Sequence, residues 1–184
     1  MKIEIQNGDN LTQLSMLIAD ISVCMLTSID ADGALVSKPM SPLEMDSSGA
    51  IWFFVDLNVD SIEQPSMTNL SFTDASNGTY VSISGYRAIN KDHAHIADLW
   101  TLFAKPWFPD GPESTNLALL KFAPNSAEYW DAPNSKMVRF FAMAASVIAG
   151  KPIGLSEHAT LVGLAATSEE MATTNVNTTE KCPV

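Results

Sequence analysis

Short apolar stretches alternate with tight-turn signals between residues 22 and 131, and this rhythm constrains the fold more than any other feature of the chain. Turn residues stand at 31–33, 47–49 and 77–78, each time between two apolar or alternating stretches. The Asn77-Gly78 pair is a strong signal for a β-hairpin. Short strands joined by such turns form antiparallel sheets. A doubly wound parallel sheet needs helices between its strands from the start, and that pattern is absent.

Hydrophobic periodicity predicts the individual elements. Apolar residues at helical spacing predict a helix over 11–21, with Asp9 or Asn10 as its cap. Gly85, inside a predicted strand, indicates a bulge or a close backbone approach. Strands are predicted over 22–30, 34–46, 50–56, 69–75, 79–89 and 117–131, the last with a break near Pro124; helices are predicted over 92–104 and 137–149, and a short helical turn over 60–68. This order favours a small antiparallel barrel with helices outside it.

The stretch 50–56 is apolar on both faces of its predicted strand. Ile51, Phe53 and Val55 share one face, and Trp52 and Phe54 share the other. A strand on a solvent-facing sheet would alternate apolar with polar residues. Both faces of this strand are therefore expected to be buried or to contact a ligand.

Composition restricts the partners. The chain has 184 residues and a formal net charge of −11, which argues against nucleic acid or an anionic membrane as the main partner. Only 17% of the residues are charged, a low share that hints at surface covered by another subunit. Neither a signal peptide nor a membrane-spanning run is recognisable, and two cysteines do not suggest a disulfide framework. The expected location is the cytoplasm.

Motifs for metal binding and catalysis are weak. His93 and His95 are two residues apart on a predicted helix and would not share a face, so a polar helix start is the favoured interpretation. Neither glycine-rich nucleotide fingerprint occurs, and the serine nucleophile elbow is missing. Cys24 lies in an apolar run without a basic neighbour and is interpreted as a buried apolar residue. The sequence therefore predicts neither a metal site nor a catalytic residue.

Two features remain after these exclusions. Lys38 lies in mid-strand beside Pro39, where it is either the protective lysine of an edge strand or a cation for an anionic ligand. Trp107 and Trp130 stand in aromatic company, "PWFP" and "EYWD", and they either pack in the core or form the wall of a ligand site. A flat heteroaromatic ligand that carries a phosphate would use both features.

Six segments together resemble a known family. In this order, "MLTSIDADGALVSKPM", "GAIWFFV", "YVSISGYRAI", "LWTLFAKPWFPDG", "LALLKF" and "AEYWD" resemble the pyridoxamine 5′-phosphate oxidase-like flavin-binding split barrels, and within them the general stress protein branch. The resemblance implies a six-stranded antiparallel split β-barrel with peripheral helices over residues 1–150, an α+β fold. The extension over 151–184 is expected to be partly mobile. The resemblance also implies a homodimer with FMN in two equivalent clefts at its interface.

The resemblance assigns the cofactor contacts. Lys38 stands where the family usually has an arginine that meets the FMN phosphate, and Val55 stands where it usually has a threonine. Ser61 stands where the family has a lysine, so the second phosphate cation is missing. Trp107, Phe108 and Trp130 are candidate flavin walls, brought to the cleft from the other subunit. The full set of candidate cofactor-binding residues is Lys38, Pro39, Met40, Phe54, Val55, Ser61, Trp107, Phe108 and Trp130.

The expected function is that of an FMN-binding protein of the general stress type, with flavin-dependent oxidoreductase chemistry if the flavin turns over. A true pyridoxamine 5′-phosphate oxidase is not expected, because the tail "SEHATLVGLAATSEEM" offers one histidine among acids instead of basic residues. Three alternatives stay open. The protein is a flavin carrier or sensor without turnover, a barrel that binds FAD or another flavin-like cofactor, or a bare dimeric scaffold.

Overall fold

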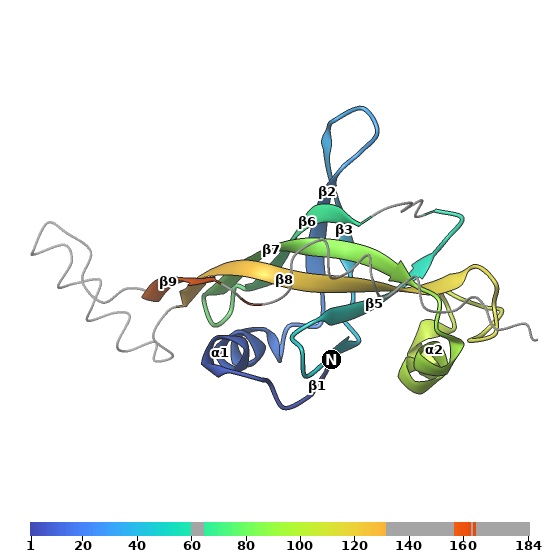
Figure 1. The fold of residues 1–184 in the computed structure, drawn as a ribbon, viewed down its shortest axis with the longest axis horizontal. Coiled ribbons are helices and arrows are strands. Elements are labelled where there is room, and N and C mark those ends of the chain that lie inside the picture. The colour runs from blue at the N-terminus through green and yellow to red at the C-terminus, as the bar shows by residue number, and fades with distance from the viewer. Residues whose placement is uncertain (60–64, 132–156, 163, 165–184) are drawn as a thin grey trace, which may run out of the picture.

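A single open sheet dominates the computed structural model, which describes residues 1–59, 65–131, 157–162 and 164 (Figure 1). The strands run in the order β1-β4-β5-β8-β7-β6-β2-β3, and β9 pairs with the far half of β8. The strands are β1 (Lys2–Ile3), β2 (Cys24–Ile29), β3 (Leu35–Met40), β4 (Glu44–Met45), β5 (Ile51–Asp56), β6 (Ser66–Asp74), β7 (Thr79–Asn90), β8 (Leu117–Asp131) and β9 (Glu157–Val162). The helices are α1 (Asp9–Ile18), α2 (His93–Leu99) and the single 3-10 turn η1 (Leu102–Ala104).

The predicted class, an antiparallel split barrel with peripheral helices, is confirmed. Six longer strands, β5-β8-β7-β6-β2-β3, follow one another in the sheet, and each neighbouring pair is antiparallel. The two-residue strands β1 and β4 and the late strand β9 bring the sheet of the described residues to nine strands. Strand β1 runs parallel to β4. The helices lie outside the sheet (Figure 1).

Most predicted elements near the N-terminus are present, with two corrections. The helix predicted over 11–21 is α1, but its N-cap is Gly8 and not Asp9 or Asn10. Asp9 instead lies in the first turn, where its negative charge interacts favourably with the positive end of the helix dipole. The single strand predicted over 34–46 is two strands. Pro42 lies in the break between them, and β3 pairs with β2 whereas β4 pairs with β5.

The helix predicted over 92–104 is shorter than expected. Asp92 caps α2 by accepting hydrogen bonds from the backbone N–H groups of Ala94 and His95. The helix ends at Leu99 because Trp100 turns to an extended backbone with ψ 132°. Phe103, expected on the buried face of this helix, is 91% exposed. Residues 66–68, expected in a helical turn, begin β6; the rest of that predicted turn, 60–64, and the helix predicted over 137–149 lie outside the described residues.

A bulge in β8 confirms the prediction made from Gly85. Ser84 pairs with Ser126 but Gly85 pairs with Pro124, so Asn125 is the extra residue. A Cβ atom on Gly85 would lie 2.2 Å from the carbonyl oxygen of Ala123. Only glycine, which has no Cβ atom, permits this close approach. The extra residue also shifts the alternation of β8. Its buried positions facing the main core are even-numbered up to Phe122 and odd-numbered from 127 on.

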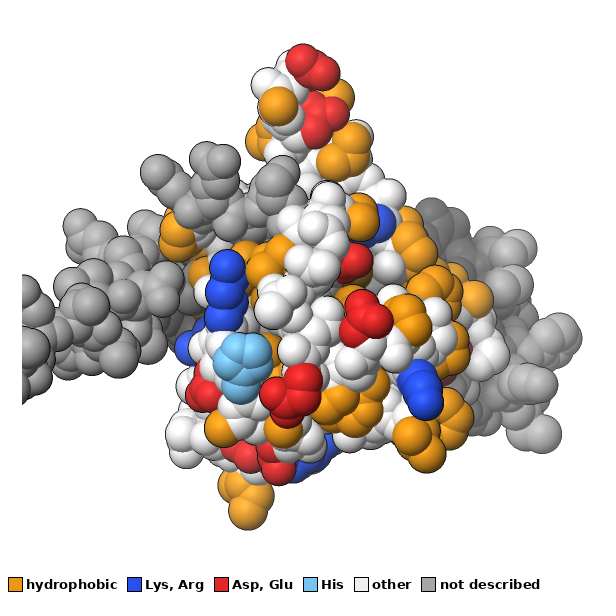
Figure 2. Space-filling view, turned by 90° about the vertical axis from the view of Figure 1, so that its right-hand side faces the viewer, with side chains coloured by type: hydrophobic (Ala, Val, Ile, Leu, Met, Phe, Trp, Pro, Cys, Tyr) orange, Lys and Arg blue, Asp and Glu red, His pale blue; other side chains and the backbone are white. Residues whose placement is uncertain are grey.

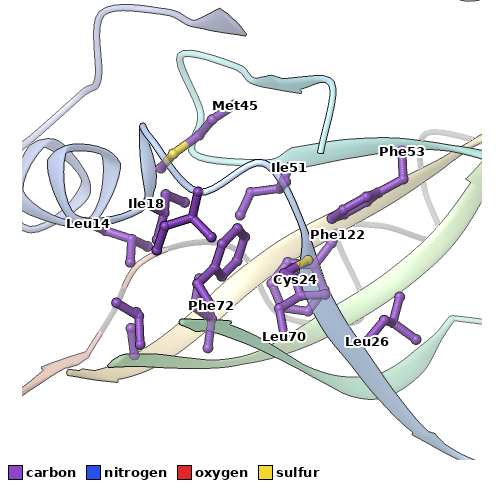
Figure 3. Close-up of a cluster of buried hydrophobic side chains, with 14 of the residues drawn as sticks. Leu14, Ile18, Cys24, Leu26, Met45, Ile51, Phe53, Leu70, Phe72 and Phe122 are labelled. Atoms are coloured by element: carbon purple, nitrogen blue, oxygen red, sulfur yellow. The ribbon is translucent and has the colours of Figure 1, made fainter. Parts of the chain in front are cut away.

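Two hydrophobic clusters flank the sheet. The larger one, here called the main core, lies between α1 and the inner face of the sheet, and it gathers side chains from β2, β5, β6, β7 and β8 (Figure 3). The smaller one, here called the α2 cluster, lies on the outer face of β5 and β8 under α2. Strand β5 contributes to both, with Phe53 in the main core and Trp52 in the α2 cluster. The prediction that both faces of β5 are buried is confirmed.

Candidate functional site

Lys38 lies on β3, an edge strand, with its side chain on the inner face of the sheet. It pairs with Leu26, which pairs in turn with Leu70, and both leucines are buried. Because facing residues of an antiparallel pair share a face, Lys38 projects on the core side, where it is half-buried. Pro39 pairs with Met25 and lies on the exposed outer face. A proline is tolerated there because β3 is an edge strand.

Phe54 and Phe108, two of the predicted site residues, are in contact on the outer face of β5. Their ring centroids are 5.9 Å apart, and the ring of Trp100 lies 5.7 Å from that of Phe54. Trp107, the neighbour of Phe108 in the loop after η1, is 80% exposed. Val55 points to the opposite side and is only 2% exposed in the main core. A ligand on the outer face of β5 would therefore meet Val55 only through its backbone.

Trp130 lies at the far end of β8 from this aromatic pair. Phe54 pairs with Leu119, whereas Trp130 pairs with Tyr80 of β7. The stretch of β8 from Leu119 to Trp130 covers roughly 36 Å at the usual rise of a strand. Within one chain, Trp130 and Phe54 therefore lie too far apart to line the same flavin. A shared cleft would need the Trp130 of a second copy.

The remaining predicted residues are placed as follows. Met40 pairs with Cys24 and packs against the main core, half-buried. Ser61 lies outside the described residues. The structure thus brings Lys38, Pro39 and Met40 together on β3, and it places the ring of Phe108, from the loop after η1, against Phe54 of β5. It does not join Trp130 to either group.

Sequence reasoning missed Arg87 on β7. It pairs with Ser66 of β6 and Phe122 of β8, and its Nε donates a hydrogen bond of 2.9 Å to the Ser66 hydroxyl. The buried Phe122 shows that Arg87, like Lys38, is on the inner face of the sheet. The alternation from Val81 through Gly85 to residue 87 could have placed it there, because β7 itself carries no extra residue.

The outer face across β3, β2, β6 and β7 is free of charge. Within these four fully described strands, every outward-facing position holds an apolar or an uncharged polar side chain. Asn69 donates to Ser82 at 2.9 Å and accepts from Ser71 at 3.0 Å, so the polar groups partly satisfy one another. Among the apolar ones, Met67 is 54% exposed and Tyr80 is 45% exposed. Such a face on an acidic chain suits contact with another protein surface.

Beside the α2 cluster lies a group of charged side chains. Glu44, almost completely buried, meets Lys2 Nζ at 2.6 Å and His95 Nε2 at 3.2 Å. The hydrogen bond and the charge of Glu44 raise the pKa of Lys2. The rings of His95 and Trp52 meet edge-on, with their centroids 4.5 Å apart. Lys121 Nζ lies 5.5 Å from the centroid of the same Trp52 ring. In the described part of the chain, acids, histidines and cysteines form no group that could hold a metal ion.

Burial makes Cys24 a poor nucleophile. Its thiol is 1% exposed in the main core, and desolvation raises its pKa to about 12. A thiolate is the reactive form, and such a pKa leaves almost none at neutral pH. The sequence-based interpretation of Cys24 as a small buried apolar residue is confirmed.

Comparison with known proteins establishes the family to which this chain belongs. Residues 9–153 match the sequence model of the family described as "Pyridoxamine 5'-phosphate oxidase like". This match covers well over half of the chain, and the chain belongs to this family. Among the described residues, none of the helices is both long and apolar enough to span a membrane.

Individual relatives are consistent with the family. The Protein bli-3 of Neurospora crassa is 24% identical over 163 residues, which cover 81% of this chain and 78% of that protein. A candidate general stress protein 26 from Jannaschia sp. CCS1 has a similar structure, with a TM-score of 0.65 and 26% identity over 82% of this chain and 99% of that one. The general stress FMN/FAD binding protein of Xanthomonas citri has a TM-score of 0.56 and 27% identity over 69% of this chain and 89% of that one.

Proposed function

We propose that this protein is a homodimeric FMN-binding protein of the general stress type, with the flavin in a cleft between the two copies. The observation that carries the proposal is the position of Lys38, a half-buried cation on the inner face of an edge strand in a chain of this family. The anion proposed to bind Lys38 is the phosphate of the flavin nucleotide. A bound flavin would supply hydride and electron transfer, and the residues of this chain would hold and orient it.

The chain offers both kinds of group that a flavin nucleotide needs, one on the inner face of β3 and the other on the outer face of β5. Lys38 offers a positive charge for the phosphate, and the Phe54–Phe108 pair offers an aromatic wall. The Xanthomonas citri protein, whose printed name states FMN/FAD binding, supports the cofactor class. Lysine binds phosphate as a point charge without the fork of an arginine, so FAD remains the second candidate cofactor.

The dimer has its own support. The uncharged outer face across β3, β2, β6 and β7 would be buried by a second copy. The separation of Trp130 from Phe54 along β8 means that both can contact one flavin only if two chains contribute. A cytoplasmic location is part of the proposal, and the reduced, buried thiol of Cys24 fits it.

The first test is spectroscopic. The purified protein, before and after addition of FMN or FAD, is examined by absorbance, and the affinity is measured by calorimetry. Flavin bands with FMN bound more tightly than FAD are the expected result. An absence of flavin bands after reconstitution together with no heat of binding would refute the proposal.

Lys38→Ala tests the phosphate contact. The variant is expected to bind FMN about ten- to a hundredfold more weakly, because it loses one charge-assisted contact. Lys91→Ala is the matched control, since Lys91 is an exposed lysine outside the strands. Equal FMN affinity in wild type and Lys38→Ala would show that Lys38 only protects the sheet edge.

Turnover separates an oxidoreductase from a carrier or sensor. The FMN-loaded dimer is incubated with NADH or NADPH and an electron acceptor, and nicotinamide oxidation is followed by absorbance. Steady oxidation above that of free FMN would support the oxidoreductase. Binding without oxidation would support the carrier or sensor.

A further inference from the structure

The chain contains two Asn-Gly pairs, Asn7-Gly8 and Asn77-Gly78, and every other asparagine precedes a residue that carries a side chain. An asparagine before glycine is prone to spontaneous deamidation, because glycine has no Cβ atom to hinder its backbone nitrogen. The glycine nitrogen loses its proton and attacks Cγ of the asparagine, and ammonia leaves as a cyclic imide closes. Water then opens the imide, so that a carboxylate of aspartate or iso-aspartate replaces the amide. The reaction therefore needs an asparagine side chain that can turn and a glycine N–H that can lose its proton.

In the turn between β6 and β7, Asp74 binds both reacting groups of the pair Asn77-Gly78. Asn77 Nδ2 donates a hydrogen bond of 2.7 Å to Asp74 Oδ2. The N–H of Gly78 donates one of 2.8 Å to the backbone carbonyl oxygen of Asp74. The first bond must break before the amide can turn, and the second retains the proton that the nitrogen must lose.

The Asp74 carboxylate is itself stabilised in its charged form. The Ser76 hydroxyl donates to Asp74 Oδ1 at 2.6 Å, and the backbone N–H of Asn77 donates to the same oxygen at 3.2 Å. These hydrogen bonds lower the pKa of Asp74. The acceptor of the Asn77 amide is therefore a carboxylate at neutral pH, and a charged acceptor makes the stronger hydrogen bond.

The pair Asn7-Gly8 has no comparable restraint. It lies in the segment that links β1 to α1 at the edge of the molecule (Figure 1), and both residues are exposed. In the part of the chain that the structure describes, neither the Asn7 side chain nor the Gly8 N–H makes a hydrogen bond. A Cβ atom placed on Gly8 would meet no atom within 4 Å. The Asn7 amide is therefore free to turn, and the Gly8 nitrogen is free to react.

We propose that Asn7 is a deamidation site of the folded protein and that Asp74 protects Asn77 from the same reaction. The two pairs share their local sequence, so the difference in reactivity comes from the fold. The proposal adds a site of covalent modification and does not depend on flavin binding.

Conversion at Asn7 would alter the start of α1. An iso-aspartate adds a backbone carbon between Gln6 and Gly8. The Gln6 side chain donates to the backbone carbonyl oxygen of Asp46 at 2.9 Å, and the Gly8 carbonyl oxygen accepts from the N–H of Thr12 at 3.0 Å. The longer backbone would shift these two anchors relative to each other and loosen the first turn of the helix.

The test compares the two pairs within one molecule. The full chain is incubated in mildly alkaline buffer, with and without urea, and digested with pepsin at low pH. Mass spectrometry follows the peptides that contain Asn7 and Asn77. In buffer, Asn7 is expected to convert at least about tenfold faster, because Asn77 must first break a charge-assisted hydrogen bond. In urea the two rates should converge. Equal rates in buffer, or a difference that persists in urea, would overturn the proposal.

Asp74→Ala tests the protection directly. In this variant Asn77 should convert at least about tenfold faster than in wild type, and Asn7 should be unchanged. Asp92→Ala is the matched control, because Asp92 also accepts backbone N–H groups but caps α2, and it should change neither rate. An unchanged Asn77 rate in folded Asp74→Ala would refute the protective role of Asp74. If Asp74→Ala does not fold, the comparison of buffer with urea decides. Flavin binding is not involved in any of these outcomes, so the proposed function stands or falls separately.

Discussion

Strands β5 and β6 line the same core, but their outer faces differ in what covers them. On β5, Trp52 is only 6% exposed, because Ile96 and Leu99 of α2 pack on that side. On β6, Met67 is 54% exposed and Asn69 and its neighbours bond to one another. Figure 2, which faces the α2 side of the molecule, shows hydrophobic and charged side chains interspersed on this surface. The uncharged outer face of β6 lacks that mixture.

The composition of each outer face follows from what covers it. Large aromatic residues occupy the outer face where the chain supplies its own cover. On the outer face of β6, where the described part of the chain supplies no cover, Met67 stands among small polar residues. Such a surface tolerates water in the monomer and can still be buried in a dimer, since it carries no charge that would have to be desolvated.

The largest expected effect tests the two faces of β6 directly. Phe72→Ala should lower the free energy of unfolding by about 3–5 kcal/mol, because Phe72 is 1% exposed in the main core. Met67→Ala, on the outer face of the same strand, should cost less than about 1 kcal/mol at low protein concentration. Urea denaturation measures both. Equal losses would mean that the outer face of β6 is already covered.

The bulge in β8 opposite Gly85 is the next target. Gly85→Ala should destabilise the protein by about 3 kcal/mol, because its Cβ would lie 2.2 Å from the Ala123 carbonyl oxygen. Gly111→Ala is the control. Gly111 has φ +81° but open space around it, so roughly 1–2 kcal/mol of backbone strain is expected. A smaller loss at Gly85 than at Gly111, again by urea denaturation, would contradict the bulge.

A charge on the outer face tests the proposed dimer. Met25→Lys places a cation on β2, where Met25 is 41% exposed. Burial of an unpaired charge costs about 3–5 kcal/mol, so the dimer should dissociate at least a hundredfold more readily. Analytical ultracentrifugation measures this, and unfolding of the separated chain should be nearly unchanged. Ile5→Lys, at a residue that is 91% exposed, is the control and should leave the dimer intact.

The buried thiol of Cys24 predicts a pH dependence. Burial raises the pKa of Cys24 to about 12 from an ordinary value of 9.0, so between these values the unfolded chain loses its proton and the folded chain keeps it. Stability is therefore complete below pH 9 and falls as pH rises, by up to about 1.4 kcal/mol per pH unit. Unfolding of Cys182→Ser between pH 8 and 11 measures the slope. The same slope in Cys24→Ala, Cys182→Ser would contradict this assignment.

The smallest effect concerns the cover of β5. Asp92→Ala removes the cap of α2, whose carboxylate accepts from the backbone N–H groups of Ala94 and His95. A loss of about 1 kcal/mol in the free energy of unfolding is expected. Asp92→Asn keeps a capping group and should lose much less. If neither variant changes stability, α2 contributes little to the burial of Trp52.

Local pattern predicted much of this fold. The helix α1, the strand β5 with its two buried faces and the close approach at Gly85 all follow from residues that are neighbours in sequence. The candidate site was less accessible. The sequence pointed to Lys38 as a cation and to Phe54 and Phe108 as aromatics, but it did not show that the two rings touch or that Trp130 lies at the far end of β8.

Local sequence pattern failed to predict the end of α2 and the pairing partners of β3 and β4. Trp100 continues the helical pattern, yet its backbone turns extended and the helix ends. The break at Pro42 was open to local analysis, but the pairing of β4 with β5 and of β3 with β2 was not. Pairing joins residues distant in sequence, and local propensity carries no information on which strand becomes the neighbour.

By itself, the sequence determined the class of fold, the apolar faces of the central strands and the acidic character of the surface. Periodicity, turn residues and side-chain charge act within a few positions, so they are legible without coordinates. The tertiary structure decided the rest: the phase of β8 beyond Asn125, the bond between Arg87 and Ser66, and the uncovered outer face of β6. These depend on register between strands, and a shift of one residue would turn each side chain to the opposite face.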